Sequence, residues 1–287
     1  MKKFLKITGI TLLIIIILMI VLPFIFKDKI VEIVKKEVNK TLTADVDFEK
    51  IGLSLFSDFP YLSVDIHEVS VVGRETFIGD TLAYVEKLHL AVNLMSIFGD
   101  DGIEVRKINL HHPIANLLID KEGNANWDIV KPSEEPETPD APDAVPVDTT
   151  ASSFKLLVKD LAITKGHIVY DDREGNMKFI ANDLDFRLSG DLTADLAMLK
   201  VALGIEKSTF VMDGIPYLSD AKIDFNGDIE ADLEHDKYTL QKNELKLNAL
   251  EFDFSGWVAM PDEDIDMDLS LKAVKSEFKN FLSLIPA

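Results

Sequence analysis

The feature that most constrains the fold is the alternation of apolar and polar side chains in Lys222–Glu234, KIDFNGDIEADLE. One parity holds Ile223, Phe225, Ile229, Ala231 and Leu233, with Gly227 as its only gap, and the other parity, after Lys222, holds five acids and one amide. Successive strand side chains point to opposite faces, so this pattern predicts a strand with one apolar and one acidic face. At about 3.3 Å per residue, the strand would be roughly 40 Å long. Its apolar face must be buried against other parts of the protein or against a ligand.

The same alternation recurs through most of the chain after residue 45. Strands are predicted at Val46–Phe48, Leu53–Leu55, Leu62–Ile66, Leu88–Val92, Val105–Leu110, Phe154–Val158, Leu161–Tyr170, Phe179–Leu188, Val201–Ile205, Tyr238–Leu240, Leu245–Met260 and Ile265–Leu271. Glycine-containing turns separate many of them, while Pro60 and Pro113 suit strand starts or edges. Short helices are expected only at Leu192–Leu199 and Ser276–Leu284. The pattern predicts a mainly β protein, an antiparallel sheet with few short helices.

The N-terminus carries a different signal. Ile7–Phe26 is 20 residues without a charge, and three lysines precede it. A bilayer-spanning helix needs about 20 apolar residues, so residues 1–27 are predicted to form a transmembrane anchor. Its representative apolar positions are Ile7, Leu12, Ile16, Val21 and Phe26. A cleaved signal peptide is the alternative, but small residues at a cleavage site are lacking.

The orientation of the anchor stays open on the residues alone. Five lysines follow the span within residues 27–40, and a count of nearby lysines places that side in the cytoplasm. The short basic N-terminus favours the opposite orientation. Residues 28–44 are predicted to form an amphipathic helix, which either lies near lipid headgroups or caps the following sheet.

Residues 131–153 separate two predicted β regions, 45–130 and 154–287. This segment holds five prolines and six acids, with no basic residue after Lys131. Such a composition cannot bury enough apolar area to offset the ordering entropy, which predicts a disordered linker or loop. A proline-rich ligand for a recognition domain is the less favoured alternative.

A weak internal repeat links the two β regions. Ile108–Asn124 and Leu161–Asn176 share the order strand, Pro or Gly, strand, and an acidic turn that ends in Glu-Gly-Asn. The first copy has one extra residue, which a bulge could absorb. Repetition of one β unit favours an elongated sheet that grows by addition.

The sequence contains no recognisable catalytic or metal-binding motif. The net charge of −20 argues against a nucleic-acid partner, and the absence of cysteine excludes disulfides and thiol chemistry. His111 and His112 would point to opposite faces of a strand, so they cannot chelate one ion. The acidic run Asp262–Asp268 lacks the turn glycine and distal glutamate of a calcium loop. No catalytic residue, metal site or cofactor is predicted.

The predicted apolar faces could be buried in two alternative ways. A closed β-sandwich would bury them against a second sheet and act through protein contacts. An open groove would bury them against lipid acyl chains instead, and the physics alone does not choose between these two. The candidate groove residues, assigned by parity, are Ile223, Phe225, Ile229, Leu233, Ile265, Met267, Leu269 and Leu271.

The order of segments resembles the N-terminal region of bacterial AsmA-like proteins of the Bacteroidetes type. The matching pieces are the basic and then apolar N-terminus, the helix to Leu42, Ile51–Pro60, Tyr61–Val72, Leu82–Val92, Ile103–Pro113, Leu117–Trp127 and Leu161–Tyr170. The most specific part is the Gly-x-x-Asn-Trp element formed by Gly123, Asn126 and Trp127.

The resemblance implies a single-pass inner-membrane protein with a cytoplasmic N-terminus and its bulk in the periplasm. It implies an elongated, curved, groove-like antiparallel sheet, similar to the β-groove of the chorein-type bridge-like lipid transfer proteins. That groove would bind or conduct phospholipid or another acyl-chain lipid and support outer-membrane and cell-envelope biogenesis, with envelope proteins as further partners. Family members are usually longer, so the resemblance implies a truncation at the C-terminal end of region 154–287. An enzyme is not expected.

Overall fold

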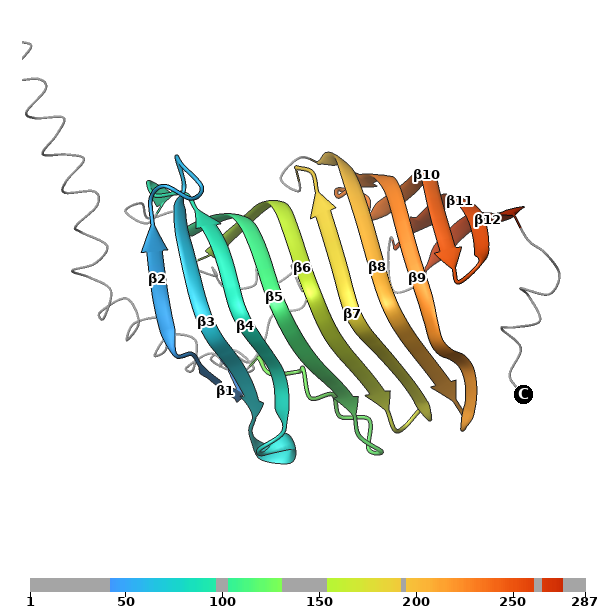
Figure 1. Cartoon of the computed structure of the whole chain (residues 1–287), viewed down its shortest axis with the longest axis horizontal. Helices are drawn as coiled ribbons and strands as arrows, with labels where there is room; N and C mark the ends of the chain where they lie inside the picture. Colours follow the sequence, from blue (N-terminus) through green and yellow to red (C-terminus); the bar gives the residue numbers. More distant parts are fainter. Residues whose placement is uncertain (1–41, 97–102, 131–153, 192–194, 261–264, 276–287) are drawn as a thin grey trace, which may run out of the picture.

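A computed structural model describes residues 42–96, 103–130, 154–191, 195–260 and 265–275. These residues form one 12-stranded sheet with a single 3₁₀ turn and no α-helix (Figure 1). The strands are β1 (Ala44–Asp47), β2 (Lys50–Ser54), β3 (Leu62–Gly73), β4 (Thr81–Val92), β5 (Ile103–Ile119), β6 (Phe154–Asp172), β7 (Met177–Ser189), β8 (Leu196–Met212), β9 (Ile215–Asp232), β10 (Lys237–Leu247), β11 (Leu250–Ala259) and β12 (Asp266–Lys275), and the turn is η1 (Glu75–Phe77). The predicted anchor, most of the amphipathic helix, the linker 131–153 and the helix Ser276–Leu284 lie outside the described residues.

From β3 onward, the strands follow one another across the sheet in sequence order, while β1 and β2 both pair with β3. Every pair is antiparallel except β5 and β6, which are parallel. The prediction of a wholly antiparallel sheet is therefore wrong at this one pair. After β5 the chain leaves the sheet, and β6 begins at Phe154 beside Ile103, so both strands run in the same direction.

The two copies of the internal repeat are these parallel neighbours. Ile108 pairs with Leu161, and the same offset continues to the pair Ile119 and Asp172. The extra residue of the first copy lies where the strand meets its acidic turn, so no bulge within the repeat absorbs it. Parallel alignment places equivalent side chains of the two copies in the same rows.

Three local predictions need correction. The predicted helix Leu192–Leu199 is wrong because Leu196–Leu199 begin β8 with alternating exposed and buried side chains; pairing with neighbouring strands outweighs helix propensity here. The single strand Leu245–Met260 is a hairpin, and it turns at Asn248 with a φ of 52°. Pro113 lies inside β5 between two neighbouring strands, directly after His112 with a φ of 46°.

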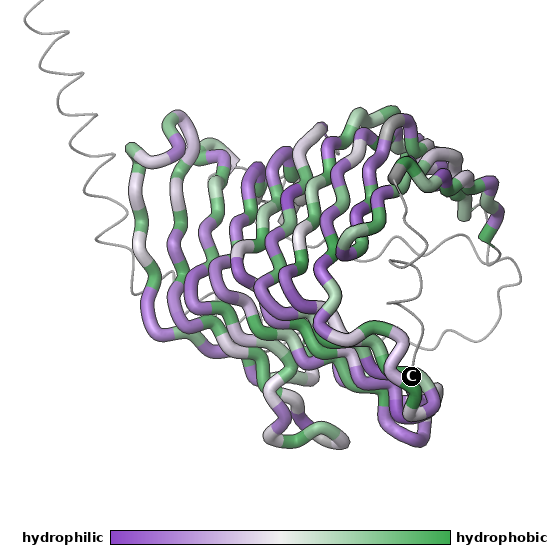
Figure 2. Tube along the Cα trace, turned by 45° about the vertical axis from the view of Figure 1, so that its right-hand side comes forward, coloured by the Kyte–Doolittle hydropathy of each residue, from purple (hydrophilic) through white to green (hydrophobic). Residues whose placement is uncertain are grey.

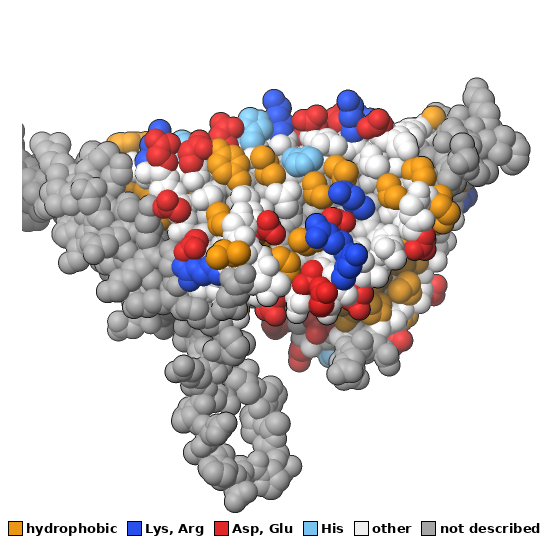
Figure 3. Space-filling view, turned by 90° about the horizontal axis from the view of Figure 1, so that it is seen from below, with side chains coloured by type: hydrophobic (Ala, Val, Ile, Leu, Met, Phe, Trp, Pro, Cys, Tyr) orange, Lys and Arg blue, Asp and Glu red, His pale blue; other side chains and the backbone are white. Residues whose placement is uncertain are grey.

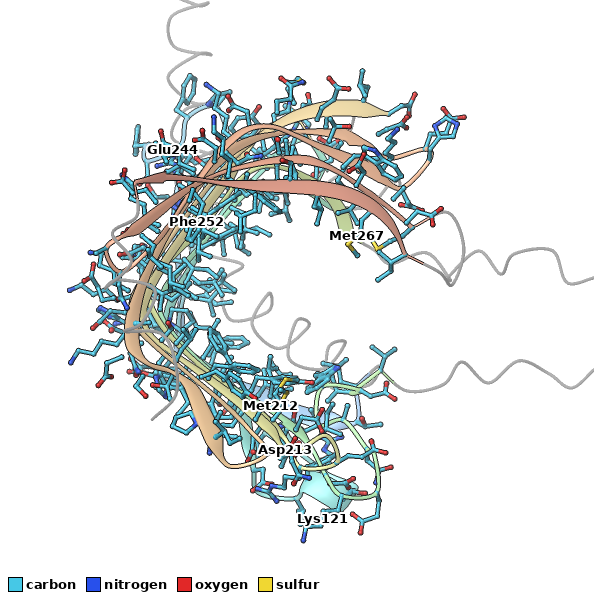
Figure 4. All side chains as sticks on the ribbon, turned by 90° about the vertical axis from the view of Figure 1, so that its right-hand side faces the viewer. Lys121, Met212, Asp213, Glu244, Phe252 and Met267 are labelled. Carbon is cyan, nitrogen blue, oxygen red and sulfur yellow. The ribbon has the colours of Figure 1, made fainter. Side chains whose placement is uncertain are left out.

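The sheet curves strongly, because its strands bend near their middles (Figure 2). Seen along the row of strands, it has a C-shaped section (Figure 4). The buried residues form small clusters within the sheet, one around Ala181, Leu184 and Ile205. The described residues include no second sheet, so the closed β-sandwich is wrong for this part of the chain.

Candidate functional site

One row of apolar side chains crosses the sheet from β2 to β12. Each member is the register partner of the next, so all point to the same face. The central apolar row consists of Ile51, Ile66, Leu88, Leu110, Ile163, Phe186, Leu203, Phe225, Leu245, Phe252 and Ala273. Most of its members are only half-buried. The face they form therefore has apolar area left to cover.

A second row runs beside it. The second apolar row consists of Leu53, Val64, Leu90, Ile108, Leu161, Leu188, Val201, Gly227, Asn243, Phe254 and Leu271. Asn243 is its one polar side chain, and Gly227 directly opposite has none. Neighbouring strands lie about 4.8 Å apart, so each row is roughly 50 Å long.

These rows line the inside of the curve. Phe252 of the central row points into the C-shaped section, as do Met212 and Met267, whereas Glu244 points outward (Figure 4). The row that alternates with the two apolar rows therefore lies on the convex side. Its members are Asp65, His89, Asn109, Ala162, Arg187, Ala202, Asn226, Glu244, Asp253 and Lys272. The sheet thus has a concave apolar face and a convex polar face.

Opposite charges are mixed on the outside of the sheet. Seen from below, acidic and basic side chains lie close together among apolar ones (Figure 3). Several form ion pairs, such as Arg187 with Asp160 at 2.8 Å and Lys222 with Glu206 at 2.6 Å. Exposed pairs of this kind contribute little stability, about 0–1 kcal/mol each. They keep the convex face solvated.

The candidate groove residues of β9 lie on the concave face. Phe225 belongs to the central apolar row, while Ile223 and Ile229 lie in parallel rows on the same face. Leu233 follows the end of β9 and packs against a small cluster that includes Leu199. Parity grouped these residues on one side of the predicted strand, but it could not show which strands would continue their rows.

The candidates of β12 share that face and are more exposed. Met267 and Leu271 expose 57% and 56% of their surface, and Leu269 exposes 39%. Ile265 lies just before the strand and exposes 59%. These values are high because β12 has a paired neighbour, β11, on only one side among the described strands. The apolar surface therefore continues to this edge of the sheet.

The Gly-x-x-Asn-Trp element has a structural role at the end of β5. Gly123 supplies a φ of +84° in the turn. The Oδ1 atom of Asn126 accepts a hydrogen bond from the Leu118 N–H at 2.9 Å, and its Nδ2 donates to the Asn116 carbonyl at 2.8 Å. Asn126 is 4% exposed. Its amide thus replaces a strand partner where the chain turns away from β5.

The segment after Asn126 connects distant parts of the sheet. The Trp127 ring lies 6.0 Å from the Tyr170 ring of β6, centroid to centroid. Two residues further on, the Ile129 carbonyl accepts a hydrogen bond from the Thr43 N–H at 2.7 Å. The segment from Trp127 to Ile129 therefore joins the end of β5 to Thr43, which directly precedes β1.

An ionic cluster holds the loop between β2 and β3 against the convex face. Asp58 in that loop accepts hydrogen bonds from Ser63 Oγ at 2.6 Å and from Lys107 Nζ at 3.2 Å. His89 Nε2 lies 2.9 Å from Asp58, and its Nδ1 lies 2.7 Å from Asp65. Burial alone would raise the pKa of Asp58, but these hydrogen bonds and nearby cations outweigh it, so the pKa is lowered.

The fold defines a mainly β protein, built as one large curved sheet with an apolar concave face. The family model described as AsmA family matches residues 1–248, and the chain belongs to the AsmA family. No curated protein matches the sequence.

The described residues contain neither a membrane-spanning helix nor a metal-binding cluster. None of their helical turns is long and apolar enough to span a membrane, and the predicted anchor lies outside them. Within the same ranges, no group of three or more histidine, aspartate or glutamate side chains could hold a metal ion.

Proposed function

We propose that the chain is a membrane-anchored periplasmic protein whose concave apolar face binds phospholipid acyl chains and conducts them along the rows. In this role it supports assembly of the outer membrane and envelope. The observation that carries the proposal is the central apolar row, which is continuous from β2 to β12 and half-buried through most of its length.

The dimensions suit such a ligand. The hydrocarbon core of a bilayer is about 30 Å thick, so one leaflet has about 15 Å of acyl chain. The rows are roughly three times that length, at about 4.8 Å per strand. Each methylene moved from water to an apolar surface contributes about 0.8 kcal/mol, so ten buried methylenes give about 8 kcal/mol.

The family match and the N-terminal sequence support the location. The match to the AsmA family begins at residue 1 and therefore includes the apolar segment Ile7–Phe26. The orientation with a cytoplasmic N-terminus is the one that the family resemblance implies. Such an anchor would hold the β region beside the inner membrane, where it could take up phospholipid directly.

Native mass spectrometry of the full chain, purified in mild detergent, tests the proposal. The wild-type protein should retain phospholipid, and Phe225→Asp should lose it because a carboxylate on the concave face opposes acyl-chain binding. The neighbouring change Asn226→Asp adds the same charge to the convex face and should retain lipid. A wild-type protein without bound lipid, and with unchanged stability on lipid addition, contradicts the proposal.

A further inference from the structure

Asn243 is an anomaly on the concave face. It is 3% exposed, yet neither its Oδ1 nor its Nδ2 atom has a hydrogen-bond partner among the described residues. A buried polar group without a partner costs about 1–3 kcal/mol, and native proteins contain few of them. The second apolar row therefore contains one polar residue that the fold itself does not use.

Gly227 makes room for this amide. A Cβ atom at Gly227 would lie 1.9 Å from Asn243 Oδ1 and 3.0 Å from Phe225 Cζ. The amide thus lies across the glycine on the same face as the Phe225 ring. Any other residue at position 227 would occupy that space. Together, Gly227 and Asn243 form a polar notch in an otherwise apolar row, between Val201 and Phe254.

A β-bulge puts the amide there. β10 shifts register between Leu240 and Asn243, so Leu240 and Asn243 both point to the concave face. In a regular strand, Lys242 would share that face with Leu240, because side chains alternate with a period of two. Bulges often re-aim a side chain beside a functional site. Here the bulge brings a neutral amide into the apolar row instead of a lysine.

The chemistry of the notch limits what it can bind. Neither apolar row contains a lysine or arginine, so a charged phosphate would lose its hydration there without a counter-charge. A neutral carbonyl can accept a hydrogen bond from the Asn243 Nδ2, and such a bond is stronger in apolar surroundings. In a phospholipid, the neutral oxygens nearest to the acyl chains are the ester carbonyls.

We propose that the polar notch of Gly227 and Asn243 binds an ester carbonyl of a lipid and sets the position of that lipid on the concave face. This inference rests on the proposed function. The tip of the Phe225 ring borders the space over Gly227, so this ring turns aside when the carbonyl reaches the amide. The notch would act as a stopping point along the rows.

The test compares two lipids on the full-length protein in detergent, by native mass spectrometry. The probes are phosphatidylethanolamine with two ester-linked hexadecanoyl chains and its diether analogue, which lacks the carbonyls. One hydrogen bond should make wild-type occupancy by the diester about three- to tenfold higher. Asn243→Leu should bind both lipids equally, and its lipid-free melting temperature should rise.

Glu244→Leu is the matched control, because it makes the same polar-to-leucine change at the adjacent residue of β10, which is exposed and points outward to the convex face (Figure 4). It should keep the diester preference. If wild type binds the diester and the diether equally, the inference about the notch is wrong and the proposed function stands. The same holds if Asn243→Leu still prefers the diester. Failure of wild type to bind either lipid overturns the proposed function as well. The ratio of diester to diether occupancy is measured on wild type alone, so the inference is testable even if Asn243→Leu does not fold.

Discussion

His112 in β5 and Lys165 in β6 occupy equivalent positions in the parallel pair, and both have a positive φ, 46° and 53°. Glu68, Asp183 and Asp220 adopt similar values of 55°, 51° and 49° inside β3, β7 and β9. Register shifts accompany some of them, on both sides of Gly166 between β6 and β7 and between Leu218 and Ala221 in β9. A left-handed residue within a strand bends it. These residues therefore account for the bend that makes one face of the sheet concave.

The strain at this bend predicts the effect of glycine. Lys165→Gly should raise the free energy of unfolding by roughly 0.5–1 kcal/mol, because glycine adopts positive φ without steric cost. Lys178→Gly, in an extended part of β7, should instead lower it by about 0.5–1 kcal/mol. Urea denaturation of the full chain in detergent measures both. Equal destabilisation by the two changes would show that Lys165 is not strained.

The exposed edge of the concave face gives a second prediction. Leu269→Asp should abolish lipid capture and leave the protein folded, because Leu269 is already 39% exposed. The adjacent Ser270→Asp places the same charge on the convex face and should retain lipid. Lipid co-purification reports capture, and circular dichroism reports folding. Unfolding of Leu269→Asp would indicate that another part of the protein covers this face.

The two hydrogen bonds of the Asn126 amide predict that removing this side chain destabilises the fold. Asn126→Ala removes both side-chain hydrogen bonds and leaves the Leu118 N–H and Asn116 carbonyl without them. We expect unfolding to become easier by about 2–3 kcal/mol. The neighbouring change Asp128→Ala, at an exposed site, should cost far less. Thermal melts compare the two, and similar melting temperatures would contradict the role given to Asn126.

The ionic cluster predicts a response to acid. The pKa of Asp58 is lowered in the folded state, so its contribution to stability is complete above the unfolded value of about 3.8. That contribution is lost as the pH falls through the folded pKa. Asp58→Asn should therefore be less stable than wild type at pH 7, and the difference should shrink below pH 4. Urea midpoints across this range test it, with the exposed Asp228→Asn as control; a constant difference would contradict it.

Much of this fold was predictable from local pattern. Alternation over Lys222–Glu234 and Ile265–Leu271 gave the strands, their faces and the candidate groove residues. The parallel pair was not predictable, because the path from Ile119 to Phe154 decides strand direction and no short-range pattern records it. Nor was the bulge near Asn243, since the sequence shows only an interrupted alternation. Gly227 was the available signal, as the one gap in the apolar parity of β9.

The central claim is that lipid occupies the concave face in the cell. A benzophenone-bearing amino acid replaces Leu203 in the central apolar row or its neighbour Ala202 on the convex side, in cells that express the full chain. After irradiation, mass spectrometry of the purified protein identifies what each position has captured. We predict phospholipid adducts at position 203 and few at position 202. Equal capture at both positions, or no lipid at position 203, would contradict the account.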